Sequence, residues 1–251
     1  MILLPCRVLP HESGDGPAHM ALDEALLDSV AEDPTSAVLR TYEWSRPTLS
    51  LGYFQSIAEA EADPRWLGVP IVRRPTGGGA LWHDREVTYA VVVPGDHPAA
   101  RPSAALYRTV HRAIAASLRE AGVEADRRGE TPRVGGPTSR PFLCFADRDA
   151  EDIVAGTVKI VGSAQRRRSG AVLQHGSLLL ARSGVTPELP GLADLVPVPA
   201  AGLRWARVLA EAIPRALGLK SEVDEVRPGE RDRAERLRRE VYEQSAWNRR
   251  R

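Results

Sequence analysis

The sequence predicts an α+β fold, in which helices flank a mixed β-sheet. Segments with helical spacing of apolar residues alternate irregularly with short strand-like apolar runs, without the strict βαβ order of a doubly wound sheet. Of the 251 residues, 43% are hydrophobic, which is enough for one large core or two small ones. The apolar runs have the length of strands, and none is long enough to cross a bilayer.

Composition narrows the functional classes. The formal net charge is +1, so no strong overall field favours nucleic acid or a membrane surface as a partner. The first residues lack the basic and long apolar regions of a signal peptide. Two cysteines, Cys6 and Cys144, are too few for a disulfide framework and fit a reducing compartment. We therefore expect a cytoplasmic protein.

Elements in the first half follow from periodicity and breakers. Apolar residues at helical spacing predict a helix over 17–30, which opens at a proline, a residue tolerated in a first turn. Ser45-Arg46-Pro47 predicts a turn between two strands. The predicted strands are 37–42, 48–53, 70–74 and 86–93, and 55–62 is predicted as a short helix.

In the second half the clearest helix is predicted over 103–121. Its apolar residues recur every four positions, at Leu106, Val110, Ile114 and Leu118, and Gly122 follows as a helix stop. Glycine, proline and charge predict a loop over 127–140. Short strands are predicted over 142–145, 158–163, 171–174 and 177–181, and helices over 205–217 and 232–242.

The densest chemical motif is residues 73–84, which read Arg-Arg-Pro-Thr-Gly-Gly-Gly-Ala-Leu-Trp-His-Asp. Three glycines leave bare backbone that a ligand can approach closely. The stretch lacks the Gly-Lys-Ser/Thr of a phosphate-binding loop and the spacing of a dinucleotide fingerprint. Glycines alone would indicate a tight turn, but the flanking Arg73, Arg74, His83 and Asp84 favour a binding site for an acyl chain and its carbonyl end.

A second motif surrounds Lys159, one of only two lysines among 34 basic residues. Lys159 lies between apolar residues on a predicted strand, where its ammonium could hold a carbonyl oxygen or a phosphate. The alternative is a strand-edge lysine with its head in water. The run Arg166-Arg167-Arg168 lacks neighbouring aromatic residues and is predicted to be a solvated turn.

Two further residues are ambiguous in isolation. His175 belongs to a predicted His-Gly-Ser turn, and a lone histidine is more often structural than catalytic. Cys144, between leucine and phenylalanine, could be a small buried hydrophobe. It could also be a reactive thiolate stabilised by a nearby cation, a role that Lys159 could fill. Neither the histidines nor the cysteines have metal-ligand spacing, so no metal site is predicted.

Taken in order, these motifs resemble the lipoate–protein ligase, octanoyltransferase and biotin ligase superfamily. The matching segments are Arg-Arg-x-Thr-Gly-Gly-Gly-x-x-x-His-Asp at 73–84, Lys-x-x-Gly-Ser-Ala-Gln-Arg at 159–166 and Gln-His-Gly-Ser at 174–177. The Met-Ala-Leu-Asp-Glu-Ala helix at 20–25 and the ending at 242–248 also resemble the family. The resemblance implies a single catalytic domain over 1–251, without a C-terminal accessory domain.

The resemblance also implies roles for individual residues. It makes Cys144 and Lys159 catalytic, with an apolar wall around Leu81, Trp82, Val91 and Leu173. The implied substrate-binding residues are Arg73, Arg74, Thr76, Gly77, Gly78, Gly79, His83, Gly162, Ser163, Ala164, His175 and Gly176.

Two chemistries share this family. Ligases activate lipoate with ATP and Mg, whereas transferases pass octanoyl from acyl carrier protein through a cysteine thioester. Because Cys144 matches the nucleophile of ligase-like octanoyltransferases, the resemblance favours transfer without a cofactor. The implied partners are octanoyl-acyl carrier protein and lipoyl domains, such as the glycine cleavage H protein and the E2 subunit of 2-oxoacid dehydrogenases; we expect a monomer that binds neither nucleic acid nor membrane.

Three alternatives remain open at this point. The first is an ATP-dependent lipoate ligase in which Lys159 contacts the adenylate. The second is an amidotransferase that moves an acyl group between lipoyl domains. The third is a non-catalytic acyl-binding or carrier-docking protein, which would not require a thiol and an ammonium in one site.

Overall fold

A mixed β-sheet forms the centre of the protein. The computed structural model describes residues 3–102, 104–129, 141–147, 149–168 and 170–250. Within these ranges the main sheet has the strand order β12-β1-β3-β7-β11-β10-β9-β8, and β2 pairs with β3. Strand β1 runs parallel to β12 and β3, and β2 parallel to β3, whereas every pair from β3 to β8 is antiparallel. The strands are β1 (Pro5–Val8), β2 (Glu12–Gly14), β3 (Ala37–Trp44), β7 (Glu86–Pro94), β8 (Ala125–Arg127), β9 (Ile153–Ala155), β10 (Val158–Arg168), β11 (Ala171–Leu179) and β12 (Lys220–Val223).

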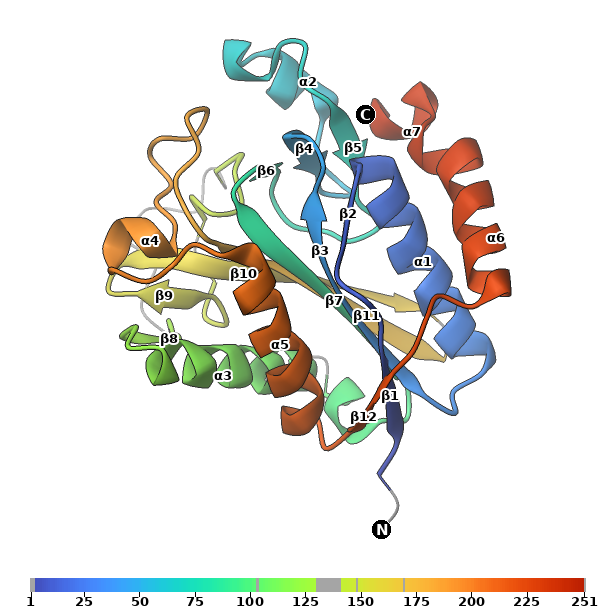
Figure 1. Cartoon of the computed structure of the whole chain (residues 1–251). Coiled ribbons are helices and arrows are strands. Elements are labelled where there is room, and N and C mark those ends of the chain that lie inside the picture. The colour runs from blue at the N-terminus through green and yellow to red at the C-terminus, as the bar shows by residue number, and fades with distance from the viewer. Residues whose placement is uncertain (1–2, 103, 130–140, 148, 169, 251) are drawn as a thin grey trace.

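Helices cover both faces of this sheet (Figure 1). On one face α1 (Gly16–Glu32) packs beside α6 (Pro228–Leu237), which continues as a π-helical turn over Arg238–Tyr242. On the other face lie α3 (Ala105–Glu120) and α5 (Gly202–Ala216). The arrangement confirms the predicted α+β class and the mixed sheet. No helix in the described ranges is long and apolar enough to cross a membrane.

A smaller sheet lies at one end of the main sheet, towards the top of Figure 1. Its strand order is β5-β4-β6, with β4 (Thr48–Leu51), β5 (Ile71–Arg73) and β6 (Leu81–His83). Near it lie the short helices α2 (Ile57–Glu61) and α7 (Ser245–Asn248) and a 3₁₀ turn at Pro64–Trp66. The short helix α4 (Leu192–Leu195) and a second 3₁₀ turn at Pro98–Ala100 instead pack against the core of the main sheet. The glycine motif connects β5 to β6. The small sheet therefore holds the glycine motif at one end of the main sheet.

Local sequence explains the main elements. The side chain of Asp15 caps α1 by accepting from Ala18 N at 3.0 Å, which leads the chain into the helix. Every residue of β7 and β11 is buried, because these central strands are covered on both faces. The apolar residues of α3 that repeat every four positions face the core, as predicted.

The strand predicted to break at the His-Gly-Ser motif is continuous. Strand β11 pairs with β7 and β10 throughout, and Gly176 lies in its middle. A Cβ at Gly176 would lie 2.3 Å from the Oγ of Ser163, so the glycine serves close packing between strands rather than a turn. The prediction of two strands was wrong because periodicity does not distinguish these two uses of glycine.

Two other predictions were wrong. Residues 142–145 form a turn that joins β6 only through a bridge between Ala80 and Leu143. The arginine run is the end of β10, not a solvated turn: Arg168 pairs with Glu24 and Asp28 of α1. The sequence prediction missed these partners because they lie about 140 residues earlier in the chain. The loop predicted over 127–140 falls mostly outside the described residues.

Candidate functional site

The two residues predicted to be catalytic come together. The Nζ of Lys159 lies 3.6 Å from the Sγ of Cys144, and it also donates to the main-chain carbonyl of Cys144 at 2.9 Å. Lys159 lies on β10, where the pairing register with β9 shifts, and Cys144 lies on a turn that packs against the glycine loop. Cys144 is partly exposed, whereas Lys159 is 6% exposed. A thiol that a substrate can reach therefore lies beside a buried ammonium.

A carboxylate completes the surroundings of this ammonium. The Oδ2 of Asp152 lies 2.9 Å from Lys159 Nζ, and both side chains are buried. Burial would lower the pKa of Lys159, but the nearby Cys144 and Asp152 raise it above its ordinary value. Burial raises the pKa of Asp152, and the charge of Lys159 opposes that rise. We infer an ion pair at neutral pH, in which Lys159 stays protonated.

Two adjoining cavities meet at Cys144. The open cavity has a volume of about 930 Å³ and is lined by Lys159 and Asp152 among others. The narrow cavity runs beneath the glycine loop, over the main sheet. Five residues line both cavities: Gly77, Gly78, Cys144, Ser163 and Ala164. The narrow cavity has a volume of about 40 Å³, so it must widen to take a chain-like ligand whose reactive end reaches Cys144.

Arg74 fixes the shape of the glycine loop from inside. Its guanidinium donates to Ser50 O at 2.9 Å and Ser50 Oγ at 2.6 Å, and to the carbonyl of Gly79 at 2.8 Å. The loop then approaches the Cys144 turn closely: a Cβ at Gly79 would lie 3.0 Å from Cys144 N. The N–H of Cys144 donates to Ala80 O at 2.7 Å, so the end of the glycine loop also holds the backbone of Cys144.

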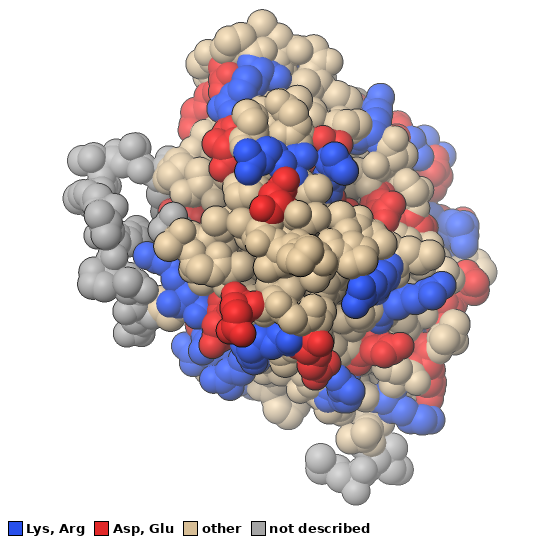
Figure 2. All heavy atoms as spheres, turned by 60° about the vertical axis from the view of Figure 1, so that its left-hand side comes forward, with Lys and Arg blue, Asp and Glu red and all other residues tan. Residues whose placement is uncertain are grey.

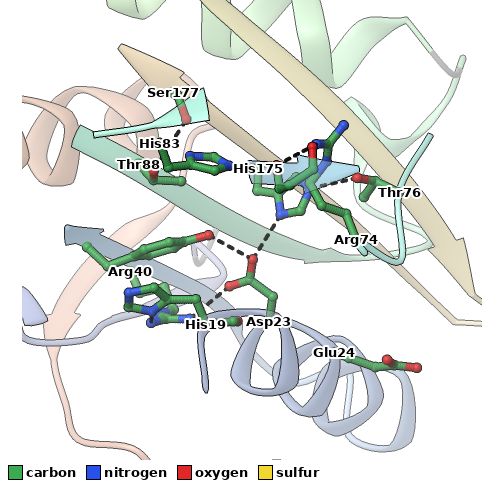
Figure 3. A network of polar contacts seen from close by, with 12 residues as sticks. His19, Asp23, Glu24, Arg40, Arg74, Thr76, His83, Thr88, His175 and Ser177 are labelled. Atoms are coloured by element: carbon green, nitrogen blue, oxygen red, sulfur yellow. Dashed lines mark hydrogen bonds and ion pairs between the residues drawn. The ribbon is translucent and has the colours of Figure 1, made fainter. Parts of the chain in front are cut away.

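A buried relay ties the loop to helix α1 (Figure 3). Thr76 Oγ1 and His175 Nε2 are 2.7 Å apart, and His175 Nδ1 lies 2.9 Å from Asp23 Oδ2. Asp23 is fully buried and also accepts from Arg40 at 2.9 Å and from Tyr42 at 3.1 Å. His175 thus has a partner on each ring nitrogen, and it connects the loop, β11 and α1.

A second relay involves His83. Its Nδ1 lies 2.5 Å from Glu86 Oε1 and its Nε2 lies 2.7 Å from Ser50 Oγ, while its ring stacks on Trp44 at 3.6 Å. This Ser-His-Glu order resembles a nucleophilic triad. However, Ser50 is fully buried and its hydroxyl is engaged by Arg74, so the relay braces the loop rather than attacking a substrate.

With this geometry described, comparison with known proteins identifies the family. The family model for the lipoyl protein ligase A/B catalytic domain matches residues 15–185 of the chain. The chain belongs to the lipoyl protein ligase A/B family. The matched range includes the five residues that line both cavities, and it includes Cys144 and Lys159.

Several relatives of this lipoyl protein ligase A/B chain carry a more specific name. It is 35% identical to octanoyltransferase LipM of Kyrpidia tusciae, over 96% of this chain and 97% of the relative. It is 40% identical to octanoyltransferase LipM of Moorella thermoacetica, over 85% and 77%. Among solved structures, lipoate-protein ligase A bound with ATP is 27% identical with a TM-score of 0.77, covering 97% of this chain and 98% of the other. The T. acidophilum protein Ta0514 with bound lipoic acid has the same identity and TM-score, over 98% and 99%.

Arg73, which the sequence prediction placed among the substrate-binding residues, holds the C-terminal segment of this lipoyl protein ligase A/B chain. Its fully buried guanidinium donates to the carbonyls of Gly52 and Gln55 and to those of Trp247, Asn248 and Arg250. Arg73 is not among the residues that line either cavity. The structure therefore places it behind the glycine loop, where it fixes strand β5.

The remaining predicted residues differ in which cavity they line. The narrow cavity alone is lined by His83, Gly162, His175 and Gly176, and the open cavity alone by Gly79. Ser163 and Ala164 line both cavities, and Thr76 lines neither. Ser163 Oγ lies 2.5 Å from His111 Nε2 and 2.6 Å from the Tyr89 hydroxyl.

The predicted apolar wall was correct only at Leu81, which lines the narrow cavity. Trp82 packs against Trp66, and Val91 and Leu173 fill the cores on opposite faces of the main sheet. The error at Val91 and Leu173 arose because strand sequence does not say which face meets a ligand.

Sequence reasoning gave no role to Asp152 or Arg40, and noted Asp23 only as part of a family-like helix. Arg40 stands within an apolar strand and Asp23 within an apolar helix, and a buried charge needs a partner. The sequence could therefore have predicted that Arg40 and Asp23 are paired. Asp152 lies in an acidic run, which normally indicates a solvated surface, so its burial beside Lys159 was not predictable.

The outer surface shows no concentration of one charge on the face in Figure 2, where basic and acidic side chains are interspersed. This pattern agrees with the net charge of +1.

Gly52 offers a test of the loop geometry. A Cβ at this position would lie 1.9 Å from the carbonyl oxygen of Gly78, so Gly52→Ala must displace the glycine loop. We expect acyl transfer to fall by about 10²-fold, the cost of roughly 1 Å of misplacement in an active site. Thermal unfolding should show that the fold persists. In contrast, Gly184→Ala meets nothing within 4 Å and should leave the rate unchanged; equal rates for both variants would contradict this role of the loop.

Proposed function

We propose that this chain is an octanoyltransferase of the LipM type, which moves octanoyl from acyl carrier protein to a lysine of a lipoyl domain through a thioester on Cys144. The single observation that carries the mechanism is the distance of 3.6 Å between Lys159 Nζ and Cys144 Sγ. Relatives named octanoyltransferase LipM, at 35% and 40% identity, support the choice of acyl group.

In the first step the Cys144 thiolate attacks the carbonyl carbon of the octanoyl thioester. The ammonium of Lys159 provides the positive charge that stabilises this thiolate. A new carbon–sulfur bond forms to Cys144, the bond to the carrier's sulfur breaks, and the carrier thiolate takes a proton from water in the open cavity. The octanoyl chain would then extend into the narrow cavity beneath the glycine loop, which must widen from its volume of about 40 Å³ to hold it.

In the second step the neutral amine of the acceptor lysine attacks the same carbonyl carbon. The amide bond forms, the bond to Cys144 breaks, and the departing thiolate regains its contact with the Lys159 ammonium. The amide nitrogen releases its extra proton to water. Thioester exchange is nearly isoenergetic and amide formation is downhill, so the proposed reaction needs no ATP and no metal ion.

The open cavity supports a macromolecular donor and acceptor. Its volume of about 930 Å³ gives both a carrier arm and an acceptor lysine access to Cys144 from solvent. We place the reaction in the cytoplasm, because a catalytic thiol must remain reduced.

The experiment is mass spectrometry of the intact protein after incubation with octanoyl-acyl carrier protein, without ATP. We expect one added octanoyl group, located on Cys144 by peptide mapping and removed by hydroxylamine. Addition of a lipoyl domain should then transfer the group to its lysine. If acylation of the lipoyl domain occurs only with free lipoate and ATP, with release of pyrophosphate, the protein is a ligase and the proposal fails.

A further inference from the structure

The Lys159 ammonium has more acceptors than N–H groups. Its Nζ lies 2.9 Å from Cys144 O, 2.9 Å from Asp152 Oδ2, 3.4 Å from Asp147 O and 3.6 Å from Cys144 Sγ. Three oxygen atoms can therefore hold the three N–H groups without the sulfur. Among these three oxygen atoms, the one that carries negative charge is Asp152 Oδ2. The Cys144 sulfur is charged only as a thiolate.

The geometry creates a hazard once Cys144 is acylated. The thioester carbonyl carbon is bonded directly to Sγ, which places it within reach of an amine 3.6 Å from that sulfur. Acylation also removes the negative charge of the thiolate. A buried ammonium that loses its counter-charge tends to lose its proton, and the neutral amine is a nucleophile.

We propose that Asp152 is a positioning residue that keeps Lys159 protonated while Cys144 carries the acyl group, and thereby prevents Lys159 from capturing that group. The inference rests on the proposed acyl-enzyme. The Asp152 carboxylate is itself fixed, because its Oδ2 accepts from Asp149 N at 2.6 Å and its side chain is buried. It therefore remains beside Lys159 in both halves of the reaction.

The side reaction that Asp152 prevents is an intramolecular transfer from sulfur to nitrogen. The neutral Nζ of Lys159 would attack the thioester carbonyl carbon, so a carbon–nitrogen bond forms and the bond to Cys144 Sγ breaks. The proton lost from nitrogen would pass to the departing thiolate. The product is an amide, which hydroxylamine does not cleave, and the enzyme would be inactivated after a few turnovers.

Other charged groups near Lys159 do not replace Asp152. His111 on α3 is buried and its pKa is lowered to about 4, chiefly by burial, so it is neutral near pH 7. Asp147, Asp149 and Glu151 also line the open cavity, but the ion pair that Lys159 makes among the described residues is with Asp152. Glu151 is paired instead with Arg108 and Arg127. The ring of Phe145, 5.2 Å from Lys159 Nζ, offers only a weak cation–π contact.

The test compares the full-length protein with its Asp152→Asn variant, which removes the charge but keeps the shape. Both are incubated with octanoyl-acyl carrier protein, treated with hydroxylamine and mapped by mass spectrometry. We expect the wild type to carry a label on Cys144 that hydroxylamine removes. In Asp152→Asn we expect an octanoyl amide on Lys159 as the major product, and formation of this amide should accelerate as the pH rises.

Two further variants separate charge from fold. Asp152→Glu should restore the hydroxylamine-sensitive label, whereas Asp152→Ser should give the Lys159 amide as Asp152→Asn does. Asp126→Asn, on an exposed residue of β8, makes the same chemical change elsewhere and should behave as wild type.

The outcomes distinguish the two proposals. A wild type that forms no thioester on Cys144 contradicts the proposed function, and this inference with it. The second possible result is that the wild type forms the thioester but the folded Asp152→Asn and Asp152→Ser variants form no amide on Lys159. This result contradicts the inference about Asp152 and leaves the proposed function intact.

Discussion

Replacing Cys144 by serine is expected to lower the rate of octanoyl transfer by a factor on the order of 10⁴ to 10⁶, the range for losing a member of a catalytic triad in a hydrolase. A serine hydroxyl must lose its proton to become an effective nucleophile. The nearest group, the Lys159 ammonium, lies 3.6 Å away and is a proton donor, so it cannot accept that proton. The measurement is a single-turnover rate with octanoyl-acyl carrier protein and a lipoyl domain.

The other cysteine supplies the control. Cys6 is fully buried in the core on β1, and burial raises the pKa of its thiol to about 12, so it is unreactive at neutral pH. Cys6→Ser should therefore retain the transfer rate while it remains folded. A Cys144→Ser protein that transfers octanoyl at the normal rate would show that Cys144 is not the nucleophile.

The largest expected effect on stability comes from Asp23→Asn. Asp23 is fully buried and pairs with Arg40, His175 and Tyr42. Neutralising it leaves the buried Arg40 guanidinium with the half-exposed Glu12 as its remaining charge partner. We expect the free energy of unfolding to fall by about 3 kcal/mol, the lower end of the range for breaking a buried pair. Denaturant unfolding at pH 7 would measure the loss. The exposed Asp232→Asn should change stability by less than about 0.5 kcal/mol.

The effect of Asp23 should depend on pH in a defined direction. Burial raises the pKa of this carboxyl, but the hydrogen bond from His175 and the charge of Arg40 outweigh burial and hold the pKa below its ordinary value. The carboxylate therefore contributes fully above its unfolded pKa of about 3.9 and loses that contribution as the pH falls through the lower folded value. The gap between wild type and Asp23→Asn should narrow below about pH 4. A gap that stays constant down to pH 2 would show that Asp23 is not charged in the fold.

Much of the secondary structure was predictable because it depends on local patterns. The spacing in α1, α3 and α5 is helical, and the apolar run of β7 has the length of a strand. The short strands β1, β8 and β12 were not predicted, since three or four residues carry too little periodicity. Strand β6 was missed for the same reason, and with it the small second sheet.

The motifs likewise gave the family, because spaced glycines, a lysine and a histidine in fixed order are readable along the chain. They did not give the roles of the arginines. Arg73 and Arg74 are neighbours in sequence, yet one holds the C-terminal segment and the other holds the glycine loop. Adjacent side chains on a strand point to opposite faces, so only the packing on each face determines their partners.

By itself the sequence determined the fold class, the family and the choice of Cys144 and Lys159. Only the tertiary structure decided that these two side chains touch, that Asp152 shares the ammonium, and that Asp23 holds the loop through His175. The reason is physical: each contact joins separate segments of the chain. Lys159 and Cys144 are 15 residues apart and His175 and Asp23 are 152 apart, and even Asp152 lies outside the strand that carries Lys159. The distance of each contact is set by strand register, a shift in that register and a turn rather than by local composition.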